Sequence, residues 1–323
     1  MVVSTIMTWL PLEDPLAAVL QGVVGACGVS LVYNLLRVCL FIHTTKQSPA
    51  DGASEKQKDD TTSSIGHLSN GIQFALLVGL LSMVGPRLSC LIVLEFCLRV
   101  FLALLLFGQG SAREVTQQLL VQCQFSLGCS LTCTLHFLHA GAPHRCLSLL
   151  LAAALSYFLS SLARRLQSHV GQLFPQHCTQ RECGVCLTLV SSGAALLPTL
   201  RRWVVMVFGV GIIAAVATMM EHFLLGADDL RFWTPMTVCY ILLLLRMLED
   251  QKSSPRGEVL LRSAGLRVGA LFFLMMMVGG YTDMAQVVFF LLGEGVCLLP
   301  SLGLLHRKAT QKEDDNCRRA KSE

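Results

Sequence analysis

Charge is scarce in this sequence of 323 residues, and hydrophobic residues dominate it. Only 14% of the residues are Asp, Glu, Lys or Arg, against about a quarter in a typical soluble domain. The net charge of +4 is spread over polar stretches, which excludes the concentrated basic surface of a nucleic-acid-binding protein. Mean hydropathy is +0.60, and apolar blocks recur at about the 17–25 residues that a helix needs to cross a bilayer. The composition therefore predicts an all-α, polytopic membrane bundle whose main partner is the lipid bilayer.

Sequence motifs of the common enzyme classes are absent as well. The chain has no phosphate-binding GxxxxGK[ST], no zinc-protease HExxH and no GxSxG nucleophile elbow. The string GGYTD at 279–283 lacks the GxGD spacing of intramembrane aspartyl proteases. His136 lies in an apolar segment, as a membrane acyltransferase requires, but its place near the segment's end favours a bond to water or a carbonyl. We therefore predict that the protein is not an enzyme and needs no cofactor.

The positions of the cysteines exclude a disulfide framework of the secreted type. Most of the 14 fall inside apolar segments, where Cys behaves as a small hydrophobe. One cluster, HCTQRECGVC, offers His177, Cys178, Cys183 and Cys186 as weak candidates for zinc ligands. Because no second C-x2-C pair follows, we favour a structural role or S-acylation over a metal site.

Nine apolar segments are predicted to cross the membrane. We expect the first to be retained rather than cleaved, since it is long and follows Glu13 and Asp14 instead of a basic stretch. A tenth stretch, 183–200, is ambiguous because it contains several polar residues and a proline. The nine predicted spans are 16–37, 66–85, 88–107, 118–138, 146–163, 203–225, 232–248, 264–281 and 284–305.

Lys and Arg indicate the orientation of these spans, because cytoplasmic loops are enriched in both residues. If 183–200 does not cross, nearly all of them fall on one side, and only Arg87, Arg145 and Arg231 fall on the other. If 183–200 crosses, this asymmetry is lost. The distribution therefore favours nine spans with the N-terminus outside and the C-terminus in the cytosol.

The same reading divides the chain into a membrane domain and short polar parts. Residues 1–15 are a short extracytoplasmic N-terminus, 16–305 form the membrane domain, and 306–323 are predicted to be a disordered cytosolic tail. A polar loop at 43–65 is also predicted to be disordered. The segment 164–202 is predicted to be cytosolic or interfacial, with arginines that contact anionic lipid headgroups.

Six strings, in one order, resemble the transmembrane protein 82 family. The resemblance implies a multi-pass membrane protein but brings no established activity, ligand or catalytic residue. The strings are LQGVVGACGV (20–29), IVLEFCLRV (92–100), CQFSLGCSLTC (123–133), GAPHRCLSLLL (141–151), QRECGVCL (180–187) and RFWTPMTVCY (231–240).

Small and polar residues inside the spans predict close helix packing. Glycines and alanines recur at helical spacing from Ala18 to Gly28 and again from Gly209 to Ala215, and such positions let helices approach closely in lipid. The span at 118–138 is unusually polar and is predicted to face the bundle interior. Polar side chains expected to bond between helices are Asn34, Gln73, Gln122, Gln124 and Tyr157.

Two opposite charges lie near the middle of the third predicted span. Glu95 precedes Arg99 by four residues, which is the favourable orientation for an ion pair on one helix face. Two central charges cost about 5–7 kcal/mol on the membrane-insertion scale, and this nearly cancels the gain from the apolar side chains around them. The charges therefore need partners inside the bundle.

Glu294 lies at a matching depth in the last predicted span and completes a predicted charge network with Glu95 and Arg99. Gly293 and Gly295 flank it, and Pro300 follows; spans interrupted by Gly or Pro around a central charge recur at transporter sites. One hypothesis is therefore transport or permeation of a small solute or ion through a polar interior. The alternative is a non-enzymatic membrane scaffold in which the network only fixes helix packing. The sequence does not distinguish the plasma membrane from the endoplasmic reticulum, and the oligomeric state stays open.

Overall fold

A computed structural model describes residues 15–47, 62–106, 119–139, 144–180, 184–220 and 285–298, with a few isolated positions between 241 and 269. All regular structure in these ranges is helical, which confirms the predicted all-α class for the part described. The N-terminus before Pro15, the spans predicted at 232–248 and 264–281, and the tail after Leu298 lie outside it, apart from those isolated positions.

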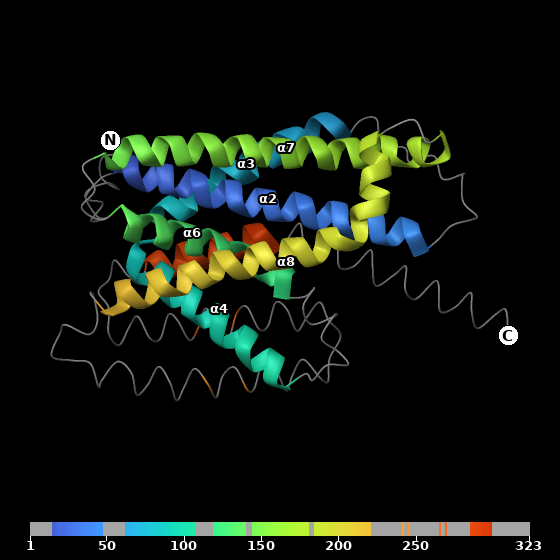
Figure 1. Ribbon diagram of the computed structural model, residues 1–323. Coiled ribbons are helices and arrows are strands. Elements are labelled where there is room, and N and C mark those ends of the chain that lie inside the picture. Colours follow the sequence, from blue (N-terminus) through green and yellow to red (C-terminus); the bar gives the residue numbers. More distant parts are fainter. Residues whose placement is uncertain are drawn as a thin grey trace.

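Seven helices build the described bundle (Figure 1). One is unlabelled in the figure and is called here the 285–298 helix. Their backbone groups bond within each helix, as a lipid environment requires, and prolines at the first residues of α2 and α4 suit a position where no intrahelical N–H is needed. The helices are α2 (Pro15–Gln47), α3 (Thr62–Met83), α4 (Pro86–Leu106), α6 (Gln124–Leu138), α7 (Arg145–Gln180), α8 (Gly184–Met219) and Ala285–Leu298.

Three of these helices contain stretches long and apolar enough to cross a membrane: Pro15–Cys39, Arg145–Val170 and Leu197–Met219. A fourth candidate is the pair Gly71–Met83 and Leu88–Phe101, which is bent by 107° at the break between α3 and α4. The described residues thus support three or four crossings, while nine crossings and the orientation of the termini stay predictions.

α2 packs against two antiparallel helices and one parallel helix (Figure 1). α3 is antiparallel to α2, since Gly22 meets Ser82 while Gly25, further along, meets Leu81. α6 also runs antiparallel to α2, whereas α7 lies parallel to α2 along much of its length. The tight contacts at Gly22, Gly25 and Gly28 agree with the packing role predicted for these positions, because a Cβ there meets α3 or α6.

One continuous helix covers residues 184–200 of the ambiguous stretch and most of the span predicted at 203–225. α8 runs from Gly184 to Met219 with Pro198 inside it, and Figure 1 shows it turning sharply before it continues along the bundle. Proline removes a helical hydrogen bond and pushes the preceding turn aside, which accounts for a bend without a loop. The apolar stretch suited to crossing begins only at Leu197.

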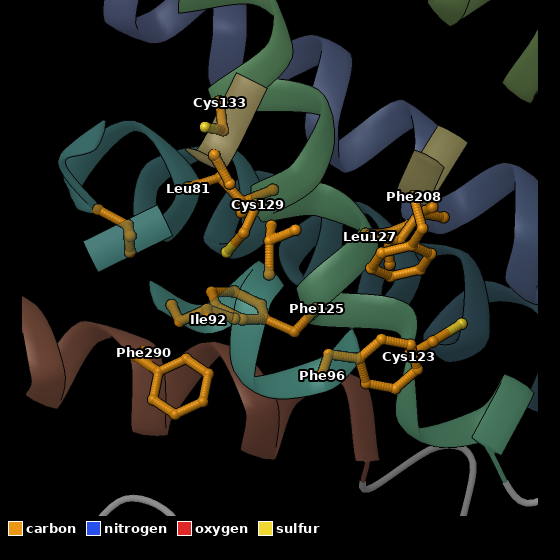
Figure 2. Packing of buried hydrophobic residues seen from close by; sticks show 14 of the residues in the cluster. Leu81, Ile92, Phe96, Cys123, Phe125, Leu127, Cys129, Cys133, Phe208 and Phe290 are labelled. Atoms are coloured by element: carbon orange, nitrogen blue, oxygen red, sulfur yellow. The ribbon is translucent and has the colours of Figure 1, made fainter. Parts of the chain in front are cut away.

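The hydrophobic core gathers around α6 (Figure 2). Phe125 of α6 contacts Phe290 with ring centroids 5.7 Å apart, and Phe96 of α4 stacks on Phe208 of α8 at 4.8 Å. Residues 124–130 of α6 are all buried, so its polar side chains face protein, as predicted from its composition. α6 is therefore the element around which the candidate site is arranged.

Candidate functional site

Glu95 and Arg99 lie inside the bundle on α4, not at its lipid-facing surface. Their exposed fractions are 1% and 5%. The Arg99 guanidinium lies over the Phe96 ring, 4.9 Å from its centroid, and the same ring stacks on Phe208 of α8. A cation over a desolvated aromatic face is stabilised by about 2 kcal/mol, so this stack holds Arg99 in place between α4 and α8.

Glu294 is buried on the 285–298 helix, with an exposed fraction of 3%. The two glycines beside it differ in their surroundings. A Cβ at Gly293 would collide with the Phe125 ring of α6, whereas a Cβ at Gly295 would meet nothing within 4 Å. Gly293 therefore allows the Glu294 helix to approach α6 closely, which explains one of the two glycines noted in the sequence.

Buried thiols connect the surroundings of Arg99 with those of Glu294. Cys123, the N-cap residue of α6, is within electrostatic range of Arg99, and Cys129, within α6, is in range of Glu294. Cys297 is within range of both Glu294 and Cys123. The base and the acid thus border the same stretch of α6, and all three predicted charges are buried; a direct network among them stays a prediction.

Ser126 is a residue that the sequence did not single out. It lies between Cys123 and Cys129 on α6, its exposed fraction is 1%, and its hydroxyl has no hydrogen-bond partner among the residues that the structure describes. Its neighbours are satisfied: Ser130 donates to the Val207 carbonyl at 3.3 Å and Thr132 to the Cys129 carbonyl at 2.9 Å. The composition of this span indicated a polar interior, but which hydroxyl lacks a hydrogen-bond partner depends on how the helices pack.

The structure gives only backbone positions for His177, Cys178 and Cys186 among the weak zinc candidates. His177 and Cys178 belong to α7 and Cys186 to α8 by their backbone, while Cys183 lies outside the described ranges. Their side chains are likewise outside the description, so the zinc hypothesis stays untested. Elsewhere in the described part, no group of three His, Cys, Asp or Glu side chains is arranged to hold a metal ion.

Long apolar helices around a buried, partly charged interior define this chain as a helical integral membrane protein. Within that class it belongs to the transmembrane protein 82 family, whose model matches residues 16–319, and the resemblance seen in the sequence is thereby confirmed. No solved structure matches the chain.

Proposed function

We propose that the protein transports or conducts a small cation or solute through the bundle interior, with its exchange site between Glu294 and α6. The observation that carries this proposal is the Ser126 hydroxyl, buried without a partner in the described part of the chain, on the helix that borders both Arg99 and Glu294. A buried hydroxyl without a partner costs about 1–3 kcal/mol. A bound cation or solute would supply the missing interaction.

The three charges have different roles in this proposal. Glu95 and Arg99 share one helix face, and Arg99 is packed on Phe96, so they hold α4 against its neighbours. Glu294 lies on a short helix that contacts α3 and the break of the bent α3–α4 pair, and interrupted helices of this kind recur where transporters bind ions. Two acids and one base leave one negative charge, which a cation or proton neutralises.

Exposed arginines support contact of one end of the bundle with anionic lipid headgroups. Arg37 lies near the end of the apolar stretch of α2, and Arg164 and Arg165 lie near the end of the apolar stretch of the parallel helix α7. Arg201 and Arg202 lie near the start of the apolar stretch of α8, which runs the other way. Arg164, Arg165, Arg201 and Arg202 are exposed. Basic side chains near a membrane surface each contribute about 1 kcal/mol of attraction to anionic lipid.

Purified protein in liposomes tests the transport proposal. Proton flux is followed with an internal pH dye under a valinomycin-set potassium potential, and a second series applies a sodium gradient. Glu294→Gln keeps the shape of the side chain and removes its charge, so it should retain the folded yield and reduce flux to that of protein-free liposomes. Ser126→Ala should fold and lower flux, and Cys146→Ser, at an exposed position, is the control that should change neither.

Arg99→Leu separates transport from the scaffold alternative. This change leaves two buried acids without their base and should lower the folded yield strongly. If Glu294→Gln loses its folded yield as fully as Arg99→Leu does, the charges serve packing alone. Wild-type liposomes that pass neither protons nor sodium would also favour the scaffold.

A further inference from the structure

A side chain of α3 hydrogen-bonds to the backbone of the Glu294 helix, although the two residues are 223 positions apart in the sequence. The Gln73 amide donates from Nε2 to the backbone carbonyl of Val296 at 3.1 Å. Val296 lies two residues after Glu294 on the same helix, so whatever fixes this carbonyl also fixes the depth and rotation of the Glu294 backbone.

The Val296 carbonyl needs a hydrogen-bond donor from outside its own helix. In an α-helix its donor would be the N–H of the residue four positions later, and that residue is Pro300, which has no N–H. A carbonyl without a partner costs several kcal/mol in a membrane interior. The Gln73 amide therefore takes the place of the backbone donor that proline lacks.

A second contact aligns the other end of the same helix with α3. Gln286 is buried, and its side-chain amide lies beside Gly85 at the break between α3 and α4, where a Cβ would be 2.8 Å from Nε2. Gln73 lies in the middle of α3 and Gly85 just past its end, while Val296 and Gln286 lie near opposite ends of their own helix. The two elements are thus antiparallel and held in register at two points.

We propose that Gln73 is the positioning residue for the Glu294 carboxylate. Its amide caps the Val296 carbonyl and thereby sets how Glu294 faces α6. The role of Glu294 rests on the proposed function, but the capping itself does not.

A double-mutant cycle tests the capping. Gln73→Met keeps the length of the side chain and removes its donors, while Pro300→Ala restores a backbone N–H for the Val296 carbonyl. We expect Gln73→Met to lower the melting temperature by about 2–4 °C in the wild-type background and to have little effect in Pro300→Ala. Gln21→Met is the matched control, because the Gln21 amide nitrogen is buried with no hydrogen-bond partner in the described part of the chain, and it should not lower the melting temperature. Equal losses from Gln73→Met in both backgrounds would overturn the capping.

Labelling of Glu294 by a hydrophobic carbodiimide, quantified by peptide mass spectrometry, tests the positioning. Gln73→Met should change the labelling rate of Glu294 at least severalfold while that of Glu95 stays the same, and Pro300→Ala in the same protein should return it toward the wild-type rate. An unchanged Glu294 rate would overturn the positioning role. A third outcome is that the double-mutant cycle shows coupling and the labelling rate changes while liposomes show no flux. That combination would keep Gln73 as the positioning residue and refute only the transport proposal.

Discussion

The two glycines that flank Glu294 provide a sharp test of the packing described here. Gly293→Ala and Gly295→Ala make the same chemical change on the same helix, two residues apart. Each replacement gains about 1 kcal/mol of helix propensity, and this gain cancels when the two variants are compared. What remains is the difference in what the new methyl group meets.

The surroundings predict opposite outcomes for the two variants. At position 293 the new Cβ collides with the Phe125 ring, whose Cδ2 is 2.7 Å from its position, and the ring is restrained by Phe290 at 5.7 Å. Overpacking of this kind costs about 1–3 kcal/mol. At position 295 there is open space, so Gly295→Ala should be stabilising, and Gly293→Ala should be less stable than it by about 1–3 kcal/mol.

Buried thiols make the comparison measurable. The Cys90, Cys129 and Cys297 side chains are buried, so a thiol-reactive fluorogenic dye reports their exposure during thermal unfolding in detergent. Adding Phe125→Leu to Gly293→Ala should recover part of the loss, because the smaller side chain leaves room for the methyl group. Equal melting temperatures for the two glycine variants would refute the close approach of this helix to α6.

Two further predictions concern the basic end of the bundle. Single cysteines introduced near Arg201 should react with membrane-impermeant reagents only after the plasma membrane is permeabilised, and labelling in intact cells would contradict the predicted orientation. Replacing Cys183 and Cys186 with Ser should leave folding intact and bound zinc at background, whereas stoichiometric zinc in the wild type that is lost on this change would restore the metal hypothesis.

The burial of the charges could be predicted from the sequence because lipid penalises a charge wherever it is exposed. Glu95, Arg99 and Glu294 had to lie inside the bundle for the chain to insert, and they do. The break between α3 and α4 could also be predicted, since Gly85 and Pro86 separate two apolar segments. The bend of 107° could not be predicted, because the angle depends on what packs against the break. The residue that packs there is Gln286, which comes from the far end of the sequence.

Polar residues inside the spans show the limit of predicting hydrogen-bond partners from sequence. Gln73 was expected to bond between helices, and it does. Asn34 was expected to do the same, yet its amide donates to the Ser30 carbonyl of its own helix at 2.7 Å. Tyr157 lies on the outer face of α7, with an exposed fraction of 56%. A polar residue in an apolar segment indicates that a partner is needed, but the helical phase and the neighbouring helices decide which partner it finds.

The shared direction of α2 and α7 has a counting consequence for α6 (Figure 1). If both helices cross the membrane once in the same sense, the number of crossings between them is odd. Counted as one broken span, the bent α3–α4 pair is itself the odd crossing and α6 adds none. Counted as two crossings or as none, the pair leaves the odd crossing to α6, although α6 carries Gln124, Ser126 and Ser130. On either count the surroundings of α6 are the rest of the protein and not lipid, since its residues 124–130 are all buried.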